Sequence, residues 1–400
     1  MNEDKNLFLK EERYFFRTYK RLGLDIDRGE GVYLIARDGK RYLDFFGGLA
    51  VNALGYNHPA VNKAIIDQVH KYIHLSNYYV QEPQVDLAER VIQASGFQRV
   101  FFSNSGTEAV EGAIKVARKW GKKHGKTELI GLSNSFHGRT MGALSLTERP
   151  KYREGYEPFL QNVSHIEFND VAQLRAVVNE QTLGIILEFI QGEGGIFVVS
   201  SEFASALNEL RQKFGFLIIA DEIQSGMGRT GKFFAFEHFG VRPDIVVIAK
   251  AIGGGLPLGA FLGNERVADV LTYGTHGTTF GGNPVACAAG VAVFQEVIDK
   301  GLMKRAGEIG GYLKTQFEGV KKEFPDLVKD VRGLGCMLGV ELTQDGQPVV
   351  DQLQEQGFLV NCTHNTVLRF LPPFIITREE CDALVKALTR ILGVLSHAKK

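Results

Sequence analysis

The chain has little of several features that would assign it to a special class of protein. Its 400 residues include four cysteines and one tryptophan, and its 46 basic side chains balance its 46 acidic ones. A formal net charge of zero removes the electrostatic motive for nucleic acid or an anionic membrane as a main partner. No uncharged apolar run approaches the length of a membrane span, and the charged start, residues 1–6, does not resemble a signal peptide. The composition therefore predicts a soluble, cytoplasmic globular protein.

The cysteines and histidines do not follow a disulfide or metal-binding pattern. The thiols are scattered at Cys287, Cys336, Cys362 and Cys381. Such scattering suits a reducing compartment, and each thiol is expected to be a small buried apolar group. His70 and His74 lie four residues apart in a helical stretch, but no third ligand follows at a suitable spacing. We therefore expect no metal site.

The pattern of apolar runs predicts the fold class. Between about residue 60 and residue 285, short apolar strands alternate with helical patterns, with strands expected at 99–102, 128–132, 183–188, 216–220 and 244–249. This alternation predicts an α/β large domain whose mostly parallel sheet is flanked by helices. Residues 286–400 are expected to form a smaller α+β domain. Residues 1–59, which contain a hairpin pattern around Asp38 and Gly39, are expected to pack with it.

Two charged residues stand where expected strands end, which is where ligands bind in parallel sheets. Asp221 follows the run 216–220, and Lys250 closes the run 244–250. A buried lysine is costly unless its charge is used or its pKa is lowered. A lysine that can form a Schiff base with an aldehyde, and an acid that keeps a pyridine nitrogen protonated, are the minimal pair for pyridoxal phosphate chemistry. We therefore predict that cofactor, with Lys250 and Asp221 as the catalytic residues.

A glycine turn between a strand and an amphipathic helix is suited to the cofactor's phosphate. Ser105, Gly106 and Thr107 lie at this turn, and a helix N-terminus offers free N–H groups and a positive dipole end. An ordinary capping box of Ser105 with Glu108 explains the segment equally well in isolation. The position at a strand end, beside the lysine and the acid, favours the phosphate.

Two further segments have side chains suited to a cofactor and its substrate. Phe136 and Arg139 follow another strand, and an aromatic ring can stack on a flat cofactor while an arginine can bind a carboxylate with two hydrogen bonds. Taken alone, a surface turn with a core phenylalanine is the simpler interpretation. Thr278 and Thr279 lie in a glycine-rich loop just before a helix. That loop suits either a phosphate contact or a plain connection between domains.

Other classes of function fit the same residues poorly. The glycines between positions 253 and 259 lack dinucleotide-binding spacing, and no acidic ribose partner is in place. A non-catalytic protein on this scaffold would be expected to have lost Lys250 or Asp221, and both are present.

Together these segments resemble the class III aminotransferases of the pyridoxal phosphate fold type I. The matching stretches are 101–109, 135–140, 191–195, 220–231, 243–250 and 276–284. The resemblance extends from about residue 28 nearly to the end, and it implies a transaminase that acts as a homodimer with shared active sites. Residues 47–55, 359–363 and 367–373 are most similar to members that move the δ-amino group of N2-acetylornithine to 2-oxoglutarate in arginine biosynthesis. Ornithine, succinylornithine and 4-aminobutyrate remain alternative donors.

The resemblance also implies individual roles at the cofactor. Lys250 would be the Schiff-base lysine and the base that moves the proton, Asp221 would pair with the ring nitrogen, and Gln224 would hydrogen-bond the ring hydroxyl. The full set of implied cofactor contacts is Ser105, Gly106, Thr107, Phe136, Asp221, Gln224, Lys250 and, from the partner subunit, Thr279.

Four residues are implied at the substrate. Arg139 would hold the α-carboxylate, with Thr278 nearby. Glu193 and Arg369 would form a switchable pair: while they are paired, a neutral or cationic chain can lie in the site, and when Glu193 leaves, Arg369 can bind a carboxylate. The alternative is a permanent buried ion pair.

Overall fold

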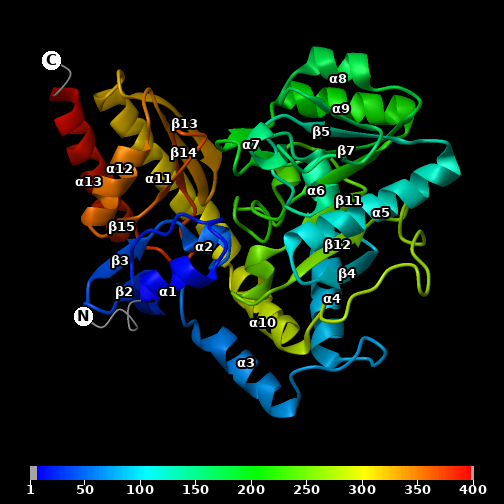
Figure 1. Cartoon of the computed structure of the whole chain (residues 1–400), viewed down its shortest axis with the longest axis horizontal. Coiled ribbons are helices and arrows are strands. Elements are labelled where there is room, and N and C mark those ends of the chain that lie inside the picture. Colours follow the sequence, from blue (N-terminus) through cyan, green and yellow to red (C-terminus); the bar gives the residue numbers. More distant parts are fainter. Residues whose placement is uncertain (1–6, 398–400) are drawn as a thin grey trace.

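The computed structural model describes residues 7–397, so the charged start at 1–6 and the last three residues lie outside the described part. Two lobes are visible in Figure 1. The beginning of the chain (blue) lies beside its end (orange and red) in one lobe, and the middle of the chain forms the other.

A seven-stranded sheet organises the larger lobe. Its spatial order is β4 (Arg99–Ser103), β12 (Gly259–Gly263), β11 (Ile245–Ile248), β10 (Leu217–Asp221), β7 (Thr182–Leu187), β5 (Glu128–Leu132) and β6 (Val163–Ile166). The strands from β11 to β6 are parallel, whereas β12 is antiparallel to both of its neighbours. All five strands expected from the apolar runs are present, so the α/β prediction is confirmed. The sequence interpretation did not include β6 and β12.

The central strands are covered on both faces. Side chains of a strand alternate between its faces, and the buried residues of β10 divide accordingly. Ile218 and Ala220 belong to one apolar cluster, and Leu217 and Ile219 belong to another. The second cluster includes apolar side chains of α5 (Gly106–His124), which packs against five strands of the sheet. The continuous apolar runs in the sequence therefore reflect burial on both faces.

The smaller lobe joins the two ends of the chain. One sheet contains β13 (Val328–Leu334), β14 (Met337–Leu342), β17 (Val367–Phe370) and β16 (Asn361–Thr363), and a second contains β1 (Ile26–Glu30), β2 (Tyr33–Ala36), β3 (Arg41–Asp44) and β15 (Phe358–Leu359). β2 and β3 form the hairpin expected around Asp38 and Gly39, and β3 pairs with β15 from the C-terminal part. The helices of this lobe are α11 (Leu302–Glu323), α12 (Gln347–Glu355) and α13 (Arg378–His397).

One helix bears on where the lobes divide. α10 (Pro284–Phe294) packs against α3 (Pro59–Lys71) and α4 (Glu82–Ser95), whereas α11 packs against β13 and α13. We therefore propose that the chain passes from one lobe to the other between α10 and α11. The remaining elements are α1 (Leu7–Tyr14), α2 (Gly47–Ala50), α6 (Met141–Leu146), α7 (Pro150–Arg153), α8 (Val171–Val177), α9 (Ser201–Phe214), β8 (Ile190–Gln191), β9 (Phe197–Val198) and the short turns at 235–238, 250–253 and 295–299.

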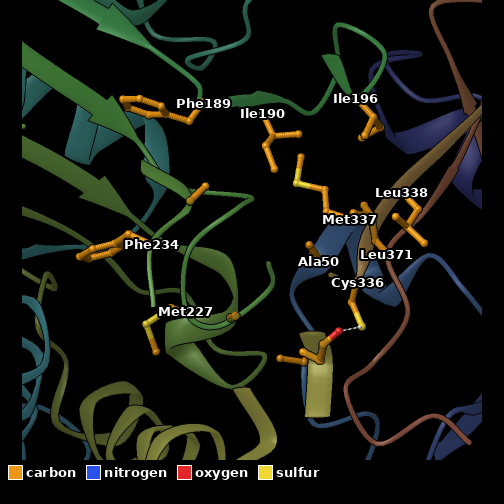
Figure 2. Packing of buried hydrophobic residues seen from close by; sticks show 14 of the residues in the cluster. Ala50, Phe189, Ile190, Ile196, Met227, Phe234, Cys336, Met337, Leu338 and Leu371 are labelled. Atoms are coloured by element: carbon orange, nitrogen blue, oxygen red, sulfur yellow. Dashed lines mark hydrogen bonds between the residues drawn. The ribbon is translucent and has the colours of Figure 1, made fainter. Parts of the chain in front are cut away.

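The two lobes share a continuous apolar core. In Figure 2, Phe189 and Met227 lie on one side of this seam and Leu338 and Leu371 on the other, with Met337 between them. Arg229 adds polar contacts across the same seam: its fully buried guanidinium donates to the carbonyl oxygens of Cys336 and Pro372 at 3.1 and 2.7 Å. The lobes are thus held by apolar packing and by a buried arginine.

Three of the four cysteines, Cys287, Cys336 and Cys381, are buried, and Cys362 is partly exposed. Within residues 7–397, no helix is both long and apolar enough to cross a membrane. The same residues contain no group of three or more His, Cys, Asp or Glu side chains that could hold a metal ion.

Candidate active site

A cavity of about 440 Å³ opens at the carboxyl ends of β10 and β11. Most of the predicted site residues line it, namely Ser105, Gly106, Thr107, Phe136, Arg139, Glu193, Asp221, Gln224 and Lys250. Strand register explains the convergence, because Asp221 at the end of β10 lies opposite Val247 near the end of β11. Residues that immediately follow parallel strands therefore meet at one edge of the sheet.

Lys250 is partly buried, and it begins a short helical turn two residues beyond the end of β11. Its backbone is left-handed, with φ of +55°, a conformation that is uncommon for a residue with a side chain. Burial lowers the pKa of the Lys250 amine, and the positive charge of Arg369 lowers it further, against the opposing charges of Glu193 and Asp221. Its amine makes no hydrogen bond or ion pair with any described residue. The lowered pKa favours the neutral form of an amine that no described residue holds.

Asp221 faces the cavity and is held from behind. One carboxylate oxygen accepts the backbone N–H of Ile223 at 3.1 Å, and the other lies 2.7 Å from Nδ1 of His137. The buried His137 ring therefore orients the carboxylate, and its Nε2 has no partner among the described residues. The sequence interpretation assigned His137 no role.

Glu188 is a site residue that the sequence interpretation missed. This buried carboxylate lines the cavity and accepts two backbone N–H groups, from Phe136 at 2.9 Å and from Gly192 at 2.8 Å. Burial raises the pKa of Glu188, and the charge of nearby Asp221 raises it further. The residue ties the aromatic segment to the loop that bears Glu193. A signal was available, because Glu188 closes an apolar strand run as Lys250 does.

The phosphate turn and the helix cap occur in the same segment. Ser105 is the N-cap of α5, and its hydroxyl oxygen accepts the N–H of Glu108 at 3.3 Å, but the Glu108 carboxylate accepts the N–H of Asn104 rather than that of Ser105, so the expected capping box is only half formed. The first N–H groups of the helix still lack intrahelical acceptors, and they lie at the cavity wall. A Cβ on Gly106 would stand 2.7 Å from Ile223, so only glycine fits this approach.

Arg139 has a free guanidinium at the cavity. It stacks 3.7 Å above the ring of Tyr152 and 5.4 Å from the ring centre of Phe136. It forms no hydrogen bond or ion pair with any described residue. Such a guanidinium can bind a carboxylate without first breaking another pair.

Glu193 and Arg369 form the expected ion pair, at 2.5 Å, where the two lobes meet. Arg369, on β17, is only 1% exposed, and it also donates to Asn361 at 3.1 Å and to Gln224 at 3.4 Å. Burial alone would raise the pKa of Glu193, but the charge and hydrogen bond of Arg369 outweigh burial and lower it. The structure thus brings the two predicted residues together in their paired state, whereas their separation stays a prediction.

The two threonines predicted from the glycine-rich loop, Thr278 and Thr279, lie outside the lining of this cavity. The hydroxyl oxygen of Thr278 accepts from the Asn104 amide at 3.4 Å, and Asn104 is a lining residue. Thr279 is exposed and does not reach the cavity of its own chain. Its contribution to the site of a second subunit stays a prediction.

The lining matches the groups that pyridoxal phosphate requires. Helix N–H groups at Gly106 face one part of the cavity, the Asp221 carboxylate another, and the Phe136 ring forms a wall. The amine of Lys250 makes no hydrogen bond or ion pair within the described chain. These residues therefore fit the cofactor.

Comparisons with known proteins agree with this geometry. Residues 14–392 match the family model for class-III aminotransferases. The acetylornithine aminotransferase of Methanocaldococcus jannaschii is 45% identical over 388 residues, which cover 95% of this chain and 96% of that protein. The structure of an acetylornithine aminotransferase from Elizabethkingia anophelis has a TM-score of 0.87 at 33% identity and covers 96% of this chain and 98% of its own. An ornithine aminotransferase structure from Toxoplasma gondii, with pyridoxal phosphate at partial occupancy, has a TM-score of 0.93 at 31% identity and covers 100% and 96%.

A second buried acid stabilises the loop behind Asp221. Glu222 accepts the N–H groups of Ala235 and Phe236 at 3.0 and 2.9 Å, and the hydroxyl of Ser225 at 2.7 Å. Burial raises the pKa of Glu222 from 4.5 to about 7. The folded protein therefore keeps this proton at pH values where the unfolded chain has lost it, and the resulting stabilisation declines as pH rises through about 7.

We predict that Glu222→Gln makes stability less dependent on pH. The contribution of a shift of this size is on the order of 3 kcal/mol. Urea denaturation at pH 5, 6, 7 and 8 should show that the free energy of unfolding of the unmodified chain declines as pH rises. The decline should be shallower in the variant. Glu209→Gln, at an exposed surface ion pair, is the matched control and should leave the slope unchanged. Equal slopes for all three proteins would contradict the prediction.

Proposed function

This chain belongs to the class-III aminotransferases, which depend on pyridoxal 5'-phosphate, and from this premise we propose that its amino donor is N2-acetylornithine. It would transfer the terminal amino group to 2-oxoglutarate and give N-acetylglutamate 5-semialdehyde and glutamate, in arginine biosynthesis. The similarity to acetylornithine aminotransferases supports this donor. The Glu193–Arg369 pair, at a cavity that also holds Lys250, is the observation that carries the proposal.

The bound cofactor supplies an aldehyde that takes the amino group and a ring that accepts electrons. We propose that Ser105, Gly106 and Thr107 bind its phosphate, because they begin α5 at the cavity wall. Asp221 would face the ring nitrogen, with its carboxylate held by His137. The remaining proposed contacts are Phe136 at the ring face and Gln224 at the ring hydroxyl.

Lys250 would move the proton. The carbon that carries the donor's amino group must lose a proton, and a neutral amine is the base for that step. Burial lowers the pKa of Lys250 and so favours the neutral form. The same amine would then deliver the proton to the carbon on the cofactor side of the transferred nitrogen. One side chain therefore serves both proton transfers.

Substrate selection would depend on three charges. Arg139, whose guanidinium is unpaired, would bind the carboxylate that is remote from the reacting carbon, which is the α-carboxylate of the donor and the γ-carboxylate of the acceptor. With Glu193 paired to Arg369, the charge of the arginine is neutralised, so the uncharged carbon chain of the acylated donor can lie in the site. With Glu193 displaced, Arg369 would bind the second carboxylate of 2-oxoglutarate or glutamate.

We also propose that two copies assemble with shared sites. Three large apolar side chains are solvent-exposed close together: Tyr78 at 97%, Val80 at 90% and Phe280 at 59%. Asn77 joins their segments by donating to the carbonyl oxygens of Thr278 and Gly281 at 3.1 and 3.2 Å. An exposed apolar group of this kind is typical of an interface. It lies next to Thr279, the residue proposed to reach the other site. A cytoplasmic location likewise stays a proposal, which cell fractionation would test.

A half-reaction assay without acceptor tests the donor. The purified, cofactor-loaded protein is titrated separately with acetylornithine, ornithine, succinylornithine and 4-aminobutyrate, and loss of its yellow colour is followed. We expect acetylornithine to bleach it at the lowest concentration. A preference for another donor would overturn the substrate but keep the chemistry. A colourless protein that takes up no pyridoxal phosphate would overturn both.

Arg369→Ala should separate the two half-reactions. We expect the reaction with 2-oxoglutarate to fall on the order of 100-fold, because the variant loses a buried charged partner for the second carboxylate. The donor half-reaction, which uses the neutralised pair, should fall far less. Arg369→Lys, which keeps the charge but loses the fork geometry, should lie between them. Equal damage to both half-reactions would rule out the switch.

Tyr78→Asp should weaken assembly. A carboxylate in an apolar interface is costly, so sedimentation at micromolar concentration should show a shift from twice the chain mass toward the single chain. Val394→Asp is the matched control, because Val394 is also exposed, at 64%, but lies on α13 in the smaller lobe. A single-chain mass for the unmodified protein would contradict the proposed dimer.

A further inference from the structure

We propose that Arg149 is the second counter-ion of Glu193, to which the carboxylate moves when it leaves Arg369. The inference rests on the proposed function, since it concerns the same switch. It assigns Arg149 a positioning role for which neither strand ends nor motifs gave any sign.

The contacts of the pair indicate which member moves. Arg369 is held by Asn361 and Gln224 in addition to Glu193, and it is almost fully buried. Among residues 7–397, in contrast, the Glu193 carboxylate has only Arg369 as a hydrogen-bond partner, and the Glu193 side chain is 23% exposed. Displacing Glu193 breaks one contact, whereas displacing Arg369 breaks three. The glutamate is therefore the mobile partner.

The backbone around Glu193 is fixed, so the movement is confined to its side chain. The Glu193 carbonyl oxygen accepts from the hydroxyl of Thr363 and from Nη2 of Arg149, the latter at 2.9 Å. The preceding residue, Gly192, donates its N–H to Glu188. The pivot of the side chain thus stands directly beside Arg149.

Space and charge both lie on the Arg149 side. A second cavity, of about 590 Å³, is lined by both Glu193 and Arg149, so Glu193 separates it from the cavity that holds Lys250. The acids Glu148 and Asp345 also line this second cavity and would repel a carboxylate that moved toward them. The exposed Lys151 on its rim has no contact with Glu193. Of Arg149 and Lys151, which both line this second cavity, Arg149 is the one that already donates a hydrogen bond to Glu193, at its carbonyl oxygen.

Arg149 is itself without an acidic partner. Its half-buried guanidinium lies 5.3 Å from the ring centre of Tyr152 and 3.4 Å from the Tyr152 hydroxyl, and it forms no ion pair with any described residue. A partly desolvated guanidinium with unused donors favours a carboxylate. Its positive charge also acts on Glu193 in the paired state, where it contributes to the lowered pKa.

The expected consequence is selective. Without Arg149, the displaced Glu193 carboxylate would lose its counter-ion in a partly buried place, so the closed Glu193–Arg369 pair would be favoured. Binding of a dicarboxylate, which needs Arg369 to be free, should then weaken by about tenfold, the usual size of one charge-assisted hydrogen bond. The donor half-reaction uses the closed pair and should be affected much less.

The experiment measures glutarate binding to the holoenzyme by calorimetry, together with the donor half-reaction. Arg149→Met should raise the glutarate Kd about tenfold. This factor should be at least about five times the factor by which the same variant slows the donor half-reaction. Lys151→Met removes a positive charge from the rim of the same cavity and should change neither. Arg149→Lys, which keeps the charge, should recover part of the binding and shows that the effect is not a general loss of folding.

A double variant tests whether Arg149 acts through Glu193. In a Glu193→Ala background no carboxylate has to move, so adding Arg149→Met should cause no further loss of glutarate affinity. A crystal structure with glutarate should place the Glu193 carboxylate against the Arg149 guanidinium.

Two results would overturn the inference. Equal losses of glutarate binding and donor reaction would show that Arg149 binds substrate or shapes the pocket. A full Arg149→Met effect in the Glu193→Ala background would show that it acts independently of Glu193. A wild-type holoenzyme that bound no glutarate would instead overturn the proposed acceptor, and the inference with it, so the two failures are distinguishable.

Discussion

The structure depends on keeping a buried arginine paired. Arg369 is almost fully removed from water, and an unpaired buried guanidinium is costly by several kcal/mol. Its partners, Glu193 and Gln224, come from the larger lobe, whereas Arg369 belongs to the smaller one. The need to neutralise one charge therefore links the two lobes at the point where substrate would bind. The apolar seam in Figure 2 holds the lobes in this relative position.

The parallel sheet supplies the rest of the site. β7, β10 and β11 are neighbours, and each is followed by a charged residue at the same edge: Glu188 directly after β7, Asp221 at the end of β10 and Lys250 two residues after β11. Because these groups are close together, the charge of Asp221 raises the pKa of Glu188, and the charges of both acids act on the pKa of Lys250. Burial lowers the pKa of Lys250 and raises that of Glu188. The parallel order of the strands thus places the three groups at one edge of the sheet. Their removal from water then shifts the pKa values of Lys250 and Glu188.

What the sequence could predict follows from how local each signal is. Five apolar strands, with Asp221 and Lys250 at the ends of two of them, were found because burial on both faces leaves a continuous apolar run. β6 was missed because its two central residues are polar, and β12 was missed because a glycine stands at each of its ends. The Glu193–Arg369 pair came only from family resemblance. The contacts of Arg149 and Glu188 depend on tertiary approach, which no local pattern encodes.

Lys250 would experience similar neighbouring charges in both states of the proposed switch, with Glu193 paired to Arg369 and with a dicarboxylate bound to Arg369. Glu193 raises the pKa of Lys250 while Arg369 lowers it, so the closed pair acts on the lysine as two opposing charges. If Glu193 left with nothing in its place, Arg369 alone would lower the pKa of the amine further. A dicarboxylate that binds Arg369 puts a carboxylate back where Glu193 was. Exchange of one carboxylate for another therefore changes which substrate fits while it preserves the basicity that proton transfer needs in both half-reactions.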